Sequence, residues 1–155
     1  MERVKVSTSQ LLKVETSGVW KEGVRTEISV RHFEPFVVDE PKSLGGTDEG
    51  PNPVEFVLAG LSSCTSVMIA IIAKELQFSY EAVEFVNEGS LDLQGLMGVE
   101  GVSPHFQSVD FDVTIKTVET EERIQQLKEK VEKRCPVMNL LVDAGVPVTS
   151  NWLKG

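Results

Sequence analysis

Residues 52–77 read NPVEFVLAGLSSCTSVMIAIIAKELQ, and this stretch decides the fold. Asn52 can cap a helix, Pro53 suits the first helical position, and Glu55 can reach back to the cap. The pattern predicts a helix from Pro53 to about Gln77, roughly 37 Å long at 1.5 Å per residue. Because apolar side chains occupy every face of this helix, it must be covered on all sides.

The same stretch contains an uncharged run, 56–73, that reaches the usual length of a membrane-spanning helix. Several hydroxyl side chains lower its hydrophobicity, no basic residue flanks its N-terminal side, and Lys74 and Glu75 follow at once. We therefore expect a buried central helix and no membrane partner.

The residues before this helix form short strand-like segments. Ser17-Gly18 and Glu22-Gly23 supply turn chemistry between them, which favours antiparallel hairpins. A loop rich in proline and glycine, 41–53, leads into the helix. Four apolar segments predict three or four short strands: Val4 with Val6, 11–14, 24–30 and 36–38.

The residues after this helix predict a second group of elements. Two half-buried strands flank a glycine-rich connection at 95–104. Thr120 can cap an amphipathic helix, and Pro136 can open a shorter one. The expected bounds are strands at 83–93 and 109–115, a helix from 120 to 134 with Ile124, Leu127 and Val131 on one face, a helix at 137–144, and a strand at 146–153. Because strands come in adjacent runs, we expect an α+β fold with largely antiparallel sheet.

Length and composition favour one compact domain over residues 1–155. The chain is 41% hydrophobic and 25% charged, and its length allows it to fold without a disulfide scaffold or a structural metal. A net charge of -9 would repel a phosphate backbone, so we expect no nucleic acid partner. The charged start, Met1 to Lys5, lacks the apolar core of a signal peptide, so we expect a cytoplasmic protein whose cysteines are thiols.

The two cysteines are the candidates for chemistry. Cys135 precedes the proline that starts a helix, and the free N–H groups of a helix start stabilise a thiolate and lower its pKa. Cys64 lies midway along the central helix, where Gly60 and Ser62-Ser63 could break the helix and give it a fresh start. Cysteines in cytosolic proteins are more often inert core residues, and this alternative stays open.

Other kinds of site find little support in the sequence. Seventy residues separate the cysteines, which matches neither a Cys-x-x-Cys pair nor zinc-ligand spacing, and His32 and His105 occur singly. The chain has no Gly-x-Ser-x-Gly elbow, phosphate loop or dinucleotide fingerprint. We therefore expect no metal and no cofactor, and thiol chemistry remains.

Five motifs together resemble the OsmC/Ohr family. They are Leu44-Gly45-Gly46, Gly50 to Glu55, Leu58 to Cys64, Pro104-His105-Phe106 and Cys135-Pro136-Val137. The resemblance implies an intertwined homodimer, with antiparallel sheets around long buried central helices. It also implies thiol-dependent reduction of organic hydroperoxides or hydrogen peroxide, with a dithiol reductant that is a lipoylated protein in part of the family.

The resemblance also implies roles for single residues. Cys64 would attack the peroxide, and Cys135 would resolve the sulfenic acid as a disulfide. The family uses an arginine from the N-terminal strands, which leaves Arg25 and Arg31 open, and a glutamate on the helix that carries the first cysteine. Glu55 is one step out of register for that role, since Val54 follows Asn-Pro here, and it can equally be the capping partner of Asn52.

A second function stays open beside the peroxidase. A non-peroxidatic member of the family would be a dimeric module that binds an apolar ligand between its subunits. Its cysteines would then serve as a redox switch or only pack. A cation and a carboxylate around Cys64 would distinguish the enzyme from this module.

Overall fold

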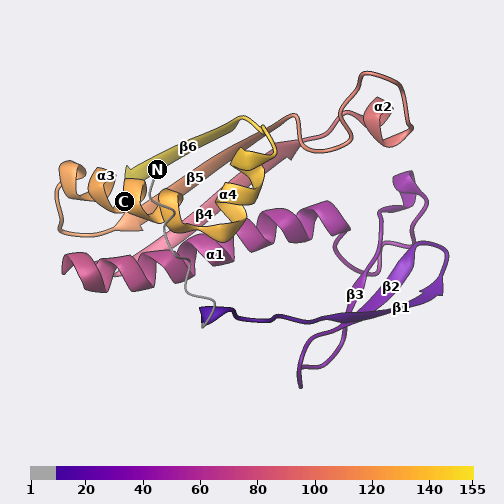
Figure 1. The fold of residues 1–155 in the computed structure, drawn as a ribbon, viewed down its shortest axis with the longest axis horizontal. Helices are drawn as coiled ribbons and strands as arrows, with labels where there is room; N and C mark the ends of the chain where they lie inside the picture. Colours follow the sequence, from indigo (N-terminus) through magenta and orange to yellow (C-terminus); the bar gives the residue numbers. More distant parts are fainter. Residues whose placement is uncertain (1–9) are drawn as a thin grey trace, which may run out of the picture. The chain divides into compact units, whose positions relative to one another are not determined.

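The computed structural model describes residues 10–155, which form two compact units (Figure 1). The first unit ends at Pro53, and the second runs from Val54 to Gly155. One domain over residues 1–155 stays a prediction, because the compactness of each unit does not decide whether the two fold together. The predicted strand at Val4 and Val6 lies outside the described residues.

The first unit is an antiparallel sheet with strand order β1-β2-β3. Its strands are β1 (Ser17–Glu22), β2 (Arg25–Ser29) and β3 (Phe36–Val38), and a short 3-10 helix, η2 (Lys42–Leu44), follows. The predicted turn at Glu22-Gly23 is confirmed, with Gly23 at φ +56°. The predicted strand at 11–14 is wrong.

The turn predicted at Ser17-Gly18 is also wrong, because both residues belong to β1. Ser17 pairs with Ser29, and Gly18 pairs with Ile28. A Cβ at Gly18 would lie 2.9 Å from Cδ1 of Ile28, so glycine makes room for a neighbouring side chain here. A glycine in a strand can mark such a close approach as well as a turn.

The second unit contains a mixed sheet with strand order β4-β5-β6. β4 (Ala82–Ser90) pairs antiparallel with β5 (Ser108–Lys116), but β6 (Val148–Lys154) runs parallel to β5. Largely antiparallel pairing is therefore confirmed among the described strands, with the β5-β6 pair as the exception. The two helices between β5 and β6 carry the chain back along the sheet, so that β6 starts at the same end as β5.

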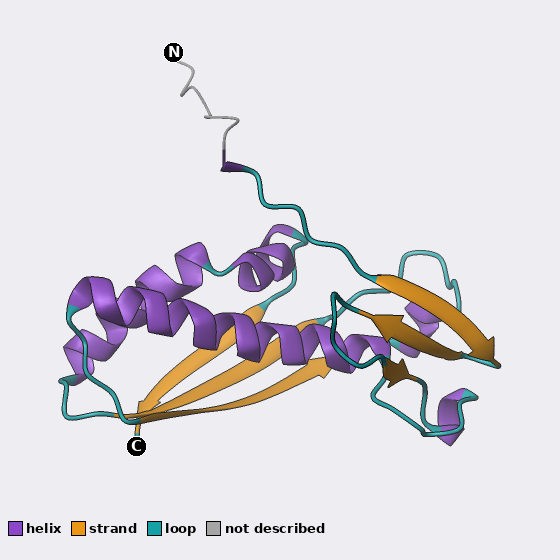
Figure 2. Ribbon diagram, turned by 90° about the horizontal axis from the view of Figure 1, so that it is seen from below, coloured by secondary structure: helices purple, strands orange, loops and turns teal. Residues whose placement is uncertain are grey.

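Helices cover one face of this mixed sheet (Figure 2). They are α1 (Pro53–Leu76), α3 (Glu121–Arg134) and α4 (Pro136–Asp143), and a single turn, α2 (Leu93–Leu96), lies in the glycine-rich connection. The inward face of β5 is fully buried beneath them, from Val109 to Ile115. Ile124, Leu127 and Val131 of α3 are all buried, so the predicted amphipathic face is confirmed.

The buried apolar core belongs entirely to the second unit. Among residues 10–155, every buried apolar side chain lies between Leu61 and Trp152. In the described part of the first unit, Asp39 is the one buried residue, while Trp20 is 67% exposed. The described residues of the first unit therefore form no apolar core of their own.

One face of α1 is uncovered in the single chain. Val67 is 57% exposed, and Val57 and Ile71 are exposed to a similar degree. By length and composition alone, α1 is long and apolar enough to cross a membrane, a test that core helices of soluble proteins also pass. The described residues of one chain do not cover α1 on all sides, so its full coverage stays a prediction.

Candidate functional site

Cys64 lies in the middle of an unbroken helix. α1 continues through Gly60 and the following serines, so the predicted fresh helix start before Cys64 is wrong. The Ser63 hydroxyl donates to the Ala59 carbonyl at 2.9 Å, and the Thr65 hydroxyl donates to the Leu61 carbonyl at 2.8 Å. These hydroxyls therefore bond within the helix without interrupting it, and the Cys64 side chain is partly buried.

Asn87 ties β4 to the turn of α1 that precedes Cys64. Its Nδ2 donates to the Leu58 carbonyl at 2.8 Å and to Ser62 Oγ at 2.9 Å. Asn87 continues the inward positions of Val83 and Phe85 along β4. A polar side chain at an inward strand position is a sequence signal that could have identified this contact.

Cys135 forms the junction between α3 and α4. Its N–H donates to the Val131 carbonyl at 2.9 Å, which closes α3, and its Sγ accepts a hydrogen bond from the Met138 N–H at 3.5 Å, which caps α4. Pro136 occupies the first turn of α4, as predicted. The Cys135 side chain is fully buried.

The structure brings the two thiols together. Both cysteines are free, and Cys64 packs against the buried cluster that contains Cys135. Burial raises the pKa of Cys135, and the neighbouring Cys64 adds to this effect, whereas the N–H groups of Met138 and Val137 lower it. The predicted lowering of this pKa is therefore wrong, because burial outweighs the helix start. Burial thus favours the protonated form of Cys135.

In the first unit, Arg25 is held by a carboxylate. Its Nη1 forms an ion pair with Oε2 of Glu49, and this hydrogen bond raises the pKa of Arg25. The pKa of Glu49 is lowered, first by the Thr47 hydroxyl, which lies 2.8 Å from Oε2, and then by Arg25. Glu49 was not predicted from the sequence as a partner of Arg25, and the expected role of Glu55 stays a prediction.

A buried aspartate fixes the loop that carries Glu49. The Asp39 carboxylate accepts hydrogen bonds from the N–H groups of Glu40, Thr47 and Glu49 at 2.8 to 3.2 Å. The Thr47 hydroxyl is the leading cause that lowers the pKa of Asp39 to about 2. Gly46 is required here, since a Cβ would lie 1.8 Å from the Glu40 carbonyl oxygen.

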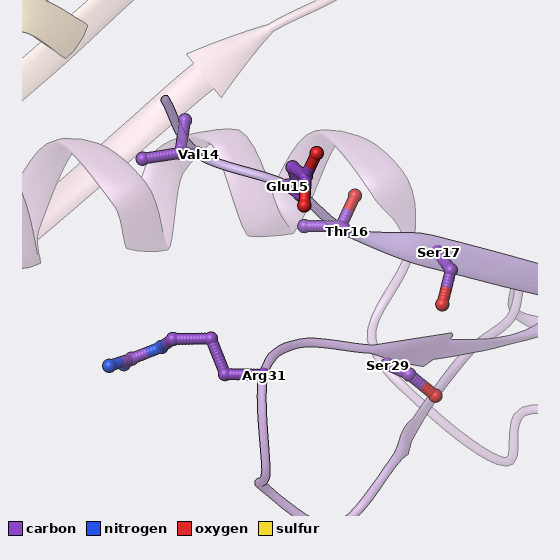
Figure 3. Close-up of a pocket in the computed structure, with 6 residues that line it drawn as sticks. All are labelled: Val14, Glu15, Thr16, Ser17, Ser29 and Arg31. Carbon is purple, nitrogen blue, oxygen red and sulfur yellow. The ribbon is translucent and has the colours of Figure 1, made fainter. Parts of the chain in front are cut away.

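Arg31 has a different setting in the same unit. It has a positive φ of 49°, and its guanidinium carbon lies 4.7 Å from the centre of the Phe33 ring. Arg31 and Ser29 face the segment from Val14 to Ser17 across an open pocket of about 570 Å³ (Figure 3). Of the two predicted arginines, Arg25 is thus the one with an ion pair in the described part of the first unit.

The expected role of Glu55 at the thiol site stays a prediction. Glu55 lies in the first turn of α1, nine positions before Cys64, which is about 13.5 Å along the helix axis at 1.5 Å per residue. An acidic side chain in this turn is favourable because it complements the helix dipole. Contact between either arginine and Cys64 stays a prediction, since the arginines belong to the first unit and the thiols to the second.

A cluster of metal-ligating side chains is not found within residues 10–155. The chemical groups that the structure does bring together are two thiols, one partly and one fully buried. The fold and this pair define the molecule as an α+β dithiol protein.

Comparison with known proteins gives the family. The family model described as OsmC-like protein matches residues 46–151, so the chain belongs to the OsmC family. The predicted family and the α+β class are therefore confirmed. No match is found among curated proteins.

Solved structures share the fold at low sequence identity. An OsmC-like protein from Mycoplasma pneumoniae has a TM-score of 0.79 at 20% identity, over 92% of this chain and 97% of that chain. An organic hydroperoxide resistance protein OsmC from Legionella pneumophila has a TM-score of 0.73 at 20% identity, over 94% and 99%. An organic hydroperoxide resistance protein from Elizabethkingia anophelis has a TM-score of 0.75 at 19% identity, over 96% and 100%.

Proposed function

We propose that the protein is a thiol-dependent peroxidase that reduces organic hydroperoxides or hydrogen peroxide in the cytoplasm. The observation that carries this proposal is the proximity of the two thiols, since Cys64 packs against the buried cluster that contains Cys135 and influences its pKa. Membership of the OsmC family supports it, as do the neighbours named as organic hydroperoxide resistance proteins. The roles of the two thiols follow from their settings, because Cys64 is the more exposed and Cys135 is fully buried.

The proposed cycle has two chemical steps before reduction. The Cys64 thiolate attacks one oxygen of the peroxide, the O–O bond breaks, and the released alkoxide takes a proton to become an alcohol. Cys64 is then a sulfenic acid. The Cys135 sulfur displaces its hydroxyl, which leaves as water with the Cys135 proton, and a Cys64–Cys135 disulfide forms.

A dithiol reductant completes the cycle. Its first thiolate attacks the disulfide, and its second thiol releases the protein, so that two protein thiols are regenerated and the reductant becomes a disulfide. We place a lipoylated protein in this role, because its dithiol has the required chemistry. The protein needs no metal or cofactor of its own in this cycle.

The proposal is tested by counting thiols. One equivalent of alkyl hydroperoxide should consume both thiols of the wild-type chain within minutes and yield an intramolecular disulfide in an intact mass spectrum. Thiols that persist under these conditions would exclude the peroxidase. They would favour the dimeric module that binds an apolar ligand between its subunits.

Arg25 is the arginine that we place beside the thiolate. Its ion pair with Glu49 gives it a fixed guanidinium, and a neighbouring cation favours a thiolate over a thiol. Arg25→Met should therefore slow peroxide consumption about tenfold or more while leaving the fold intact. The rate is measured by stopped-flow mixing with an alkyl hydroperoxide.

Arg31→Met is the matched control, since it removes the same charge from an arginine of the same unit. Its rate should equal that of the wild type. If both variants consume peroxide as fast as the wild type, neither arginine has a part in the mechanism.

We also propose that the protein is an intertwined homodimer. The first unit has no buried apolar side chain among its described residues, and α1 leaves Val57, Val67 and Ile71 exposed. A second copy would cover these surfaces and complete the burial that the apolar α1 requires. Static light scattering at micromolar protein should give the mass of two chains, and the melting temperature should fall on dilution. The mass of one chain, with melting unchanged by dilution, would contradict the dimer.

A further inference from the structure

We propose that Asn139 is a positioning residue that holds the Cys135 thiol against Cys64. Its importance for turnover rests on the proposed peroxidase function, but its effect on the thiol pair does not. The proposal concerns the bend between α3 and α4, where the backbone leaves one helix and enters the next within a single residue.

The end of α3 lacks donors for its last carbonyls. In a continuing helix, the Glu132 carbonyl would accept from the N–H of residue 136. That residue is Pro136, which has no N–H. Cys135 also leaves the helical conformation, with ψ at 116°, so the chain turns away before the Lys133 carbonyl can be paired in the helix.

The Asn139 side chain supplies the missing donors. Its Nδ2 lies 2.9 Å from the Glu132 carbonyl oxygen, 3.3 Å from that of Lys133 and 2.8 Å from that of Cys135. Its backbone N–H donates to the Cys135 carbonyl as well, at 3.0 Å. One residue of α4 therefore binds the end of α3 and the carbonyl of the buried cysteine at once.

These contacts fix Cys135 on three sides. Its N–H is held by Val131, its carbonyl by Asn139, and its Sγ by the Met138 N–H. The backbone at a residue limits the rotamers of its side chain, and the Met138 N–H holds Sγ in one of them, so a fixed bend helps to fix where Sγ points. The thiol then lies in the buried cluster against which Cys64 packs.

Measuring the redox equilibrium of the thiol pair distinguishes a positioning role of Asn139 from a general stabilising role. The protein dithiol reacts with one oxidised glutathione to give the protein disulfide and two reduced glutathione molecules. A contact that stabilises the dithiol and disulfide forms equally leaves this equilibrium unchanged. A contact that holds the sulfurs close together raises their effective concentration and favours the disulfide.

The experiment compares Asn139→Asp with the wild-type chain in glutathione buffers, with the disulfide fraction read by thiol alkylation and mass spectrometry. Aspartate has nearly the same shape, suits the first turns of a helix, and cannot donate at neutral pH. The equilibrium constant for disulfide formation should fall about tenfold, which raises the reduction potential by ~30 mV. Asn139→Leu removes the donors without adding charge and should also lower the equilibrium constant for disulfide formation.

Asn151→Asp is the matched control, because Asn151 also donates a side-chain hydrogen bond, to Asp112 Oδ1, on strands away from the bend. Its potential should equal that of the wild type. Unchanged potentials in both Asn139 variants would reduce Asn139 to a stabilising role and overturn the proposal. A wild-type chain that forms no intramolecular disulfide in any buffer would overturn it too. A chain that forms the disulfide with glutathione but not with peroxide would overturn only the proposed peroxidase.

Discussion

Cys64→Ser is expected to abolish peroxide turnover, with a loss on the order of a thousandfold or more. A serine hydroxyl is a far poorer nucleophile than a thiolate at neutral pH, and no other described residue offers an equally exposed thiol. The variant should keep its fold, because serine is smaller than cysteine and can bond within the helix as Ser63 does. Peroxide consumption with a dithiol reductant in excess measures the effect.

Ser63→Ala is the matched control for that variant. It changes the neighbouring position of α1 and removes a hydroxyl that bonds only to carbonyls of its own helix. Turnover should be close to that of the wild type. Turnover that survives in Cys64→Ser would remove Cys64 from the attacking role.

Cys135→Ser should permit one attack per chain and then lead to irreversible oxidation. The sulfenic acid on Cys64 would have no partner thiol, so excess peroxide without reductant should convert it to a sulfinic acid. The fold should hold, because serine is a good N-cap and can accept from the Met138 N–H in place of Sγ. Intact mass spectrometry should show one added oxygen, then two, where the wild type shows a disulfide.

The two cysteine variants together test whether the cysteines only fill space in the core. If the cysteines only fill space, both variants should react with peroxide to the same small extent. A Cys135→Ser chain that resists overoxidation as well as the wild type would show that Cys135 does not resolve the sulfenic acid.

The elements of the second unit were largely predictable because they border a core. The helical spacing of Ile124, Leu127 and Val131 reflects one buried face, and the alternation from Val109 to Ile115 reflects another. The parallel pairing of β6 was not predictable, because alternation does not encode strand direction. In the first unit, all of β1 is exposed, so its pattern carries little information about burial.

The sequence singled out the two thiols of the candidate site but not their environment. Cys64 and Cys135 followed from motifs, whereas their contact across seventy residues depends on how α1, α3 and α4 pack. The pKa of Cys135 was predicted in the wrong direction, because a sequence shows the helix start but not the burial. Glu49 and Asn139 make contacts at long range or across a bend, which spacing alone does not show.

The separation of the two thiols along the chain has a thermodynamic consequence. A bond between Cys64 and Cys135 would close a loop of about seventy residues. Closing a loop of that size restricts the unfolded chain and is worth roughly 4 kcal/mol in the chain-entropy account. Each catalytic cycle would therefore alternate between a form that resists unfolding and one that yields to it more readily. Oxidation would protect the protein from unfolding at the time when peroxide is present.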